Sequence, residues 1–158
     1  MKSLSTLEVR PARIEDAAII GANIRQADRL ELEASTKLNP TDAIAESIAL
    51  SVACWTATLD GIPIASFGVT SISLMGGVGS PWLLGSTECD RVIVPFVRLT
   101  RVYIPLMLSL FPRLENLVDV RNVKSIRWLK RLGFTFRDAI PHPHSGAPFH
   151  PFEMTRDV

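Results

Sequence analysis

Several acidic side chains and one phenol in this 158-residue sequence have types and positions that could do chemistry. Asp28 and Glu31 lie three residues apart in a polar segment, and their carboxylates could bind a cationic amine. The same spacing also suits a solvated helix face with local ion pairs. Glu88 follows a predicted strand and could serve as a general base. Tyr103 is the only tyrosine; its hydroxyl could act as an acid if it reaches a site, and otherwise its ring would pack in the core or in a groove.

The second half of the sequence is basic. Ten Lys and Arg residues lie between Arg91 and Arg137, against two acidic residues, whereas the segment from Leu7 to Asp60 has nine acidic and five basic residues. This asymmetry suggests that the basic half faces an anion, either a polyphosphate cofactor or a nucleic acid, and solvated helix faces are the alternative. Nucleic acid is the less favoured partner, because aromatic residues do not interleave with the basic ones.

The histidines and cysteines do not indicate a metal site. All three histidines lie in the proline-rich segment 141–150, without a neighbouring cysteine, so we expect a hairpin loop in which His142 or His144 could carry protons. Cys54 and Cys89 are too few for a disulfide framework and predict free thiols in a reducing cytoplasm. The longest apolar run, from Val102 to Phe111, is too short to span a bilayer, and the N-terminus does not have the pattern of a signal peptide.

Elements that could position these side chains follow from periodicity and from turn residues. In the first half we expect a strand at 7–11 and a helix that begins near Glu15 and buries Ala18, Ile19, Ala22 and Ile24. A second helix, capped by Asn39, should bury Ile44 and Ile48. Three antiparallel strands follow, at 51–59, 62–73 and 82–85, joined by reversals at Asp60–Gly61 and at 75–79.

In the second half, a helix at 95–110 should be kinked by Pro105 and stopped by Pro112. A buried strand at 117–120 precedes a helix that Asn122 caps and Gly133 ends. Strands beginning at Phe134 and at Pro148 complete the chain. No linker or repeat divides residues 1–158, so we expect one domain.

This element order, with Asn122-x-x-Ser125 and Leu132-Gly133-Phe134, resembles the GNAT acyltransferase family. The resemblance implies an α/β (α+β) fold, with a mixed central sheet of about six to seven strands flanked by about four helices. It also implies acetyl-CoA as co-substrate, an acyl group passed directly to the amine of a protein or small molecule, and in many members a homodimer. Asn122 and Ser125 match the residues that flank the pantetheine arm, and Leu84 and Gly85 lie where the fourth strand offers it backbone bonds.

The sequence departs from the family at two places. The glycine-rich phosphate loop, Gln/Arg-x-x-Gly-x-Gly/Ala, aligns with Arg98 at its first position and with Arg101 and Tyr103 at its small positions. Either Arg91, Arg98 and Arg101 bind the phosphates through their side chains, or CoA no longer binds. The tyrosine that protonates the leaving sulfur in many members is replaced by Leu129.

A narrower pattern is similar to GNAT-like proteins encoded by tailed bacteriophages. It combines Arg10-Pro11, the segment from Pro81 to Thr87, the glycine-free arginine-rich loop and the segment from Asn122 to Lys130. That group includes acetyltransferases and small internal virion or assembly proteins. We therefore expect an N-acetyltransferase, and the alternative is a catalytically inactive GNAT-fold binding protein with a role in virion assembly or in binding a host target.

Overall fold

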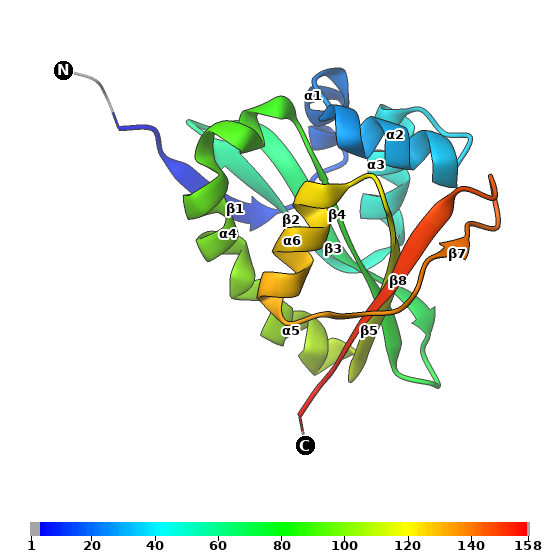
Figure 1. Cartoon of the computed structure of the whole chain (residues 1–158). Coiled ribbons are helices and arrows are strands. Elements are labelled where there is room, and N and C mark those ends of the chain that lie inside the picture. Colours follow the sequence, from blue (N-terminus) through cyan, green and yellow to red (C-terminus); the bar gives the residue numbers. More distant parts are fainter. Residues whose placement is uncertain (1–3, 158) are drawn as a thin grey trace.

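The computed structural model describes residues 4–157, which form one mixed sheet with helices on both faces (Figure 1). Its strands are β1 (Leu7–Pro11), β2 (Ser51–Leu59), β3 (Ile62–Ser73), β4 (Val78–Gly85), β5 (Arg113–Asp119), β6 (Thr135–Phe136), β7 (Ile140–Pro141) and β8 (Pro148–Thr155). They are ordered β1-β2-β3-β4-β5-β8-β6, and β7 pairs with β8. Every neighbouring pair is antiparallel except β4 and β5.

Helices α1 (Asp16–Ala22) and α3 (Pro40–Leu50) pack on one face of the sheet, and α2 (Gln26–Ser35) lies beside them. Asn39 caps α3, as predicted, by accepting the Asp42 N–H. The predicted buried face of the first helix is wrong. Ala17 and Ile20 are buried, whereas Ala18, Ile19 and Ala22 are exposed; of the predicted residues only Ile24, beyond the helix, is buried.

The rotation of α1 follows from a long-range contact. Asp16 is buried, and its carboxylate accepts hydrogen bonds from Arg10 on β1 at 2.7 and 2.9 Å, from the Arg13 N–H at 2.8 Å and from the Thr56 hydroxyl on β2 at 2.7 Å. This contact points the start of the helix into the sheet. The apolar pattern of the helix, with two adjacent pairs of apolar residues, allows either face to be buried.

The other face carries α4 (Ile93–Arg101), α5 (Tyr103–Leu110) and α6 (Val123–Leu132), and the 3-10 helix η1 (Thr87–Val92) precedes α4. The predicted single helix at 95–110 is two helices that meet at Val102, with a bend of 42° between the segment Thr87–Arg101 and α5. Pro105 causes a break one turn before itself, because it donates no hydrogen bond to the Arg101 carbonyl and its ring crowds that group. With this break and a separate α2, the described residues form six α-helices rather than the predicted four.

Strands β4 and β5 diverge soon after they begin, as Figure 1 shows in the middle of the sheet. Only Val78 with Arg113 and Gly79 with Leu114 are paired between them. β5 is longer than the predicted strand at 117–120, and its other neighbour is β8. The divergence leaves an unpaired edge of β4 inside the molecule, and this edge determines where a ligand could bind.

Within residues 4–157, no single helix is both long and apolar enough to cross a membrane. Thr87–Arg101 and Tyr103–Leu110 meet the criterion of length and composition only together, as the bent pair described above.

Candidate active site

A cavity of about 230 Å³ lies where β4 and β5 diverge. Its walls come from β4, β5, α2, α5, α6 and the loop between β7 and β8, and most of the lining side chains are apolar. The side chain of Asn116 on β5 spans the inner end of the gap, where its Nδ2 donates to the Pro81 carbonyl on β4 at 2.8 Å. Beyond this hydrogen bond, β4 and β5 have no further paired residues in the described part of the chain.

The backbone of Leu83 is directed into this gap. β3 and β4 pair in regular register from Ala65–Gly85 to Ser71–Gly79, so alternate residues of β4 bond to β3 and the others point away. The Ser86 N–H bonds to the Ile64 carbonyl, whereas the Pro81 carbonyl and both backbone groups of Gly85 bond elsewhere. Leu83 shares the direction of Pro81 and Gly85, so its N–H and C=O face the gap between the strands.

Gly85, one of the predicted cofactor contacts, already has partners inside the protein. Its N–H donates to Asp28 Oδ2 at 3.0 Å, and its carbonyl accepts from the Arg25 N–H at 2.9 Å. The Arg25 side chain also pairs with Asp28, at 3.0 Å. Burial raises the pKa of the Asp28 carboxyl, and Arg25 and the Gly85 amide oppose this rise. Asp28 therefore forms a local ion pair, with Arg25, but this pair is buried rather than solvated and attaches α2 to β4.

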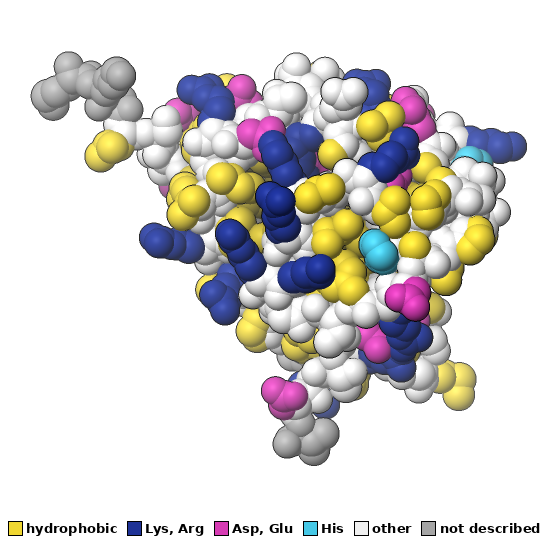
Figure 2. Space-filling view, in the orientation of Figure 1, with side chains coloured by type: hydrophobic (Ala, Val, Ile, Leu, Met, Phe, Trp, Pro, Cys, Tyr) yellow, Lys and Arg dark blue, Asp and Glu magenta, His cyan; other side chains and the backbone are white. Residues whose placement is uncertain are grey.

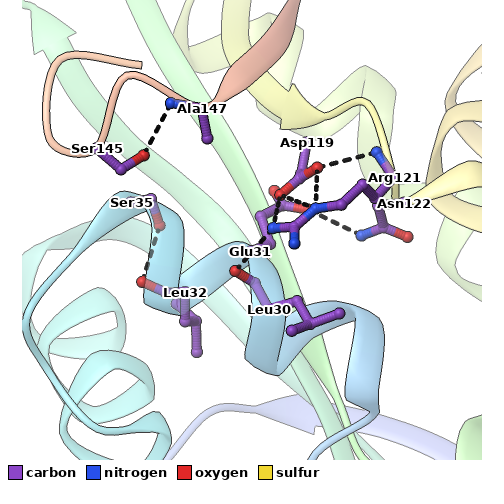
Figure 3. Close-up of polar contacts among 9 residues, drawn as sticks. All are labelled: Leu30, Glu31, Leu32, Ser35, Asp119, Arg121, Asn122, Ser145 and Ala147. Atoms are coloured by element: carbon purple, nitrogen blue, oxygen red, sulfur yellow. Dashed lines mark hydrogen bonds and ion pairs between the residues drawn. The ribbon is translucent and has the colours of Figure 1, made fainter. Parts of the chain in front are cut away.

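Glu31 lies one turn further along α2 and lines the cavity. Asn122 Nδ2 donates to its Oε2 at 2.8 Å, and among the described residues no cation pairs with it (Figure 3). Burial raises the pKa of Glu31 to about 7, and the charges of Asp28 and Asp119 add to this rise, while the Asn122 amide and the Asp119 backbone N–H oppose it. Glu31 is thus a carboxyl group that titrates near neutral pH beside a cavity.

Asn122 has two contacts that hold the start of α6. Its Oδ1 accepts the Ser125 N–H at 3.3 Å, which confirms the predicted N-cap, and its Nδ2 holds Glu31. Next to it, Arg121 is paired with Asp119 at 2.6 Å, as Figure 3 shows. Asn122 and Ser125 both line the cavity, as do Asp28, Glu31 and Leu84. The structure therefore brings five of the predicted site residues together.

His142 closes the cavity from the loop between β7 and β8. The His144 N–H donates to His142 Nδ1 at 3.0 Å, so Nδ1 is an acceptor and the hydrogen of the neutral ring is on Nε2. Burial, and then His144, lower the pKa of His142. At neutral pH this ring is a hydrogen-bond donor through Nε2, and its role as a proton carrier stays a prediction.

The predicted phosphate-binding arginines lie outside the cavity, on an exposed basic face. Figure 2 shows Lys and Arg side chains gathered over the face that α4 and α6 form. Arg98 and Arg101 lie in the last turn of α4, and Arg91 pairs with Glu88 at 2.8 Å. The segment aligned with the family's phosphate loop is helical, so its backbone N–H groups are largely used within α4 and α5.

The two predicted catalytic residues do not line the cavity. Glu88 is on η1, where its carboxylate pairs with Arg91. The Tyr103 ring packs against Trp55 at 4.7 Å and Phe67 at 5.3 Å between ring centroids, which is the packing role considered as its alternative. Both catalytic roles stay predictions, and the geometry favours neither.

Trp128 is a cavity-lining residue that the sequence analysis did not single out as a site residue. Its indole Nε1 is buried and has no hydrogen-bond partner among residues 4–157, whereas Nε1 of Trp82, in the same cavity wall, donates to Ser51 at 2.8 Å. The only feature of the sequence that could have indicated Trp128 is its position directly before Leu129, which replaces the family's tyrosine. No group of three or more His, Cys, Asp or Glu residues that could hold a metal ion occurs in the described part of the chain.

No protein-family model matches the sequence, and no curated protein matches it. Solved structures do match. The RimL ribosomal L7/L12 alpha-N-protein acetyltransferase in complex with coenzyme A has a TM-score of 0.71 at 11% identity, covering 96% of this chain and 95% of that one. A GNAT-family acetyltransferase from Streptococcus pneumoniae has a TM-score of 0.67 at 15% identity, covering 95% and 99%.

The aminoglycoside acetyltransferase AAC(6')-Ib, also in complex with coenzyme A, has a TM-score of 0.66 at 18% identity, covering 96% of this chain and 95% of that one. At such identities the likeness is one of fold, and it extends over nearly all of this chain. The mixed sheet, the divergence of β4 and β5 and the helix that begins at Asn122 agree with it. This chain has the GNAT acetyltransferase fold.

Proposed function

We propose that this protein is an acyl-CoA-dependent N-acyltransferase, which passes an acyl group, in the first instance acetyl, directly to an amine. The observation that carries the proposal is the cavity between β4 and β5, which has the Leu83 backbone on one wall and Glu31 on another. The pantetheine arm carries amide groups and would pair with Leu83 as an added strand does. The apolar walls would exclude water from the thioester.

In this proposal the arginine-rich face replaces the backbone phosphate loop. Arg98 and Arg101 on α4 lie next to the basic face of α6, and guanidinium groups form charge-assisted bonds with phosphate. A side-chain site of this kind depends more on ionic strength than a buried backbone site does, because exposed charges are screened by salt. CoA affinity should therefore fall measurably between 50 and about 300 mM salt.

A non-catalytic binding protein is the second candidate, and two observations favour it. The phosphate-loop segment is helical, and both backbone groups of Gly85 are bonded to α2. These are the changes expected if the fold is kept while the cofactor is lost. A bacteriophage origin and a role in the virion belong to the same proposal, and their support is the sequence pattern from Pro81 to Thr87 and from Asn122 to Lys130.

Thermal unfolding with acetyl-CoA and with CoA separates the two candidates. A ligand that binds the native state at 100 times its dissociation constant stabilises it by about 2.7 kcal/mol, which raises the melting temperature by several degrees. Arg98→Ala and Arg101→Ala should each reduce this shift. Arg137→Ala, which removes the arginine that pairs with Glu153 of β8, should leave it unchanged. Absence of any shift with the wild-type chain would reject the acyltransferase proposal and favour the binding protein.

A further inference from the structure

Glu31, which is half-buried, differs from the buried aspartates near the cavity because its hydrogen-bond partners are neutral. Asp28 pairs with Arg25 and the Gly85 amide, and Asp119 pairs with Arg121. Glu31 Oε2 accepts a hydrogen bond from the Asn122 amide, and the Asp119 backbone N–H, a second neutral donor, also favours the ionised carboxyl; among residues 4–157 no cation pairs with Glu31. A carboxylate that is largely removed from water without a cation is unfavourable, and such a group beside a cavity is a candidate for a functional role.

Glu31 lies where it could take a proton from an amine that attacks a thioester held in the cavity. Asn122 and Ser125 lie at the start of α6, and Leu83 and Leu84 lie at the end of β4; all four line the cavity that Glu31 also lines. The 2.8 Å bond to Asn122 fixes the Glu31 side chain from the α6 side, and α2 fixes its backbone. An amine that enters between α2 and the loop of His142 would meet Glu31 before it met the apolar interior.

We infer that Glu31 is the general base of the proposed transfer, in place of Glu88. The amine nitrogen forms a bond to the thioester carbonyl carbon, the carbon–sulfur bond breaks, and the thiolate leaves with the electron pair. Glu31 Oε1 takes the proton that the nitrogen gives up. Glu31 then releases this proton to solvent and solvent supplies a proton to the thiolate, so that the carboxylate is restored and CoA leaves as a thiol. This inference rests on the proposed function.

Five residues face Glu31. They are Asp28 on the same helix, Asp119 at the end of β5, Arg121 just after β5, Asn122 at the start of α6, and His142 across the cavity. The charges of the two aspartates disfavour the ionised form of Glu31, and the Asn122 amide and the Asp119 backbone N–H favour it. A base whose pKa lies near the working pH is ionised in a large fraction of the molecules and is still basic enough to accept a proton from the amine. Arg121 is held by Asp119 and therefore leaves Glu31 without a direct ion pair.

The test compares Glu31→Gln with Glu33→Gln, an exposed glutamate two residues along the same helix. The glutamine side chain keeps an oxygen that can accept the hydrogen bond from Asn122, but it cannot ionise. Acetyl transfer to a series of small primary amines is measured from pH 5.5 to pH 9, together with the thermal shift by acetyl-CoA. General bases typically contribute 10²–10⁴-fold, so Glu31→Gln should lower kcat by about 100-fold or more. Its acetyl-CoA shift should equal that of the wild type, and the rise in rate near pH 7 should disappear.

Other outcomes overturn the inference. If Glu31→Gln transfers acetyl groups at the wild-type rate with the wild-type pH profile, Glu31 is not the base. If Glu88→Gln instead shows the loss, the base is Glu88. If Glu31→Gln raises KM with kcat unchanged, Glu31 only binds the amine. A wild-type chain that acetyl-CoA does not stabilise overturns the proposed function and, with it, this inference.

Discussion

Two carboxylates of this fold have opposite environments: Asp16, buried at the start of α1, and Glu31, half-buried on α2. Asp16 accepts four hydrogen bonds, two of them from the Arg10 guanidinium, in a layer between helix and sheet. Burial raises its pKa, but Arg10, the Arg13 N–H and Thr56 outweigh burial and hold that pKa below its usual range. Glu31 accepts one bond from a neutral amide beside a cavity, and its pKa is raised to about 7.

The difference shows which carboxylate stabilises the fold and which one destabilises it. An acid whose pKa falls on folding contributes stability above its unfolded pKa, and this stability is lost as the pH falls through the folded pKa. An acid whose pKa rises on folding does the reverse, and the stability that it contributes when protonated is lost as the pH rises. Asp16 is in the first class and Glu31 is in the second.

The largest expected effect on stability is a gain in Glu31→Gln at alkaline pH. A rise in pKa from 4.5 to about 7 corresponds to about 3 kcal/mol at 1.36 kcal/mol per unit. The wild-type chain should lose this stability between about pH 4.5 and 7, so the variant should exceed it by up to about 3 kcal/mol at pH 8 and by much less at pH 5. Urea unfolding at the two pH values measures the difference. Equal midpoints at pH 8 would show that ionised Glu31 does not destabilise the folded protein.

Replacing Asp16 should have the opposite sign. In Asp16→Asn, Arg10 loses its charged partner and the amide cannot accept all four hydrogen bonds, which should lower the free energy of unfolding by about 2–3 kcal/mol at pH 7. The loss should shrink as the pH falls towards 3, where the wild-type carboxylate also takes up a proton. Glu15→Gln, an exposed change in the preceding residue, is the matched control. A constant difference from pH 7 to pH 3 would contradict the assignment of this network as ionised.

Asn122→Ser separates the two tasks of Asn122. Serine also caps helices, so the bond to the Ser125 N–H can be replaced, but its side chain does not extend as far as an amide. The variant should lose less than about 1 kcal/mol of stability, and because the Asn122 amide lowers the pKa of Glu31, that pKa should rise. Carboxyl-carbon NMR of Glu31 across pH 5 to 9 checks this. An unchanged titration would mean that the 2.8 Å bond has no influence on Glu31.

The contrast also shows what a sequence can predict. The ends of α6 follow from local residues, since Asn122 caps the helix and Gly133 at φ 103° ends it, and both were predicted. The buried face of α1 was predicted wrongly, because it depends on the contact of Asp16 with Thr56, which lies 40 residues away in the sequence. Spacing placed Asp28 and Glu31 on one side of a helix, but it could not show that one would pair with Arg25 and the other would face Asn122.

The helical phosphate-loop segment shows a further limit of sequence analysis. The missing glycines at Arg101 and Tyr103 were evident in the sequence, but they could not show that this segment is divided between α4 and α5. Pro105 was predicted to kink one continuous helix, whereas the structure has two helices that meet at Val102, because a proline disturbs the turn before it. Burial of the Trp128 indole without a partner depends on packing around the cavity, which no spacing rule reveals.

Glu88→Gln should have the smallest effect, and it completes the comparison with an acidic group that is neither buried nor beside the cavity. Glu88 pairs with Arg91 three residues away at 2.8 Å, and the side chains keep 43% and 73% of their exposure. Exposed pairs of this spacing contribute about 0.3–0.5 kcal/mol, and salt screens them. The substitution should therefore change the urea midpoint only slightly at low salt and still less in 0.5 M salt, where the Debye length is about 4 Å. A loss above about 1 kcal/mol would show that η1 needs this pair to place the start of α4.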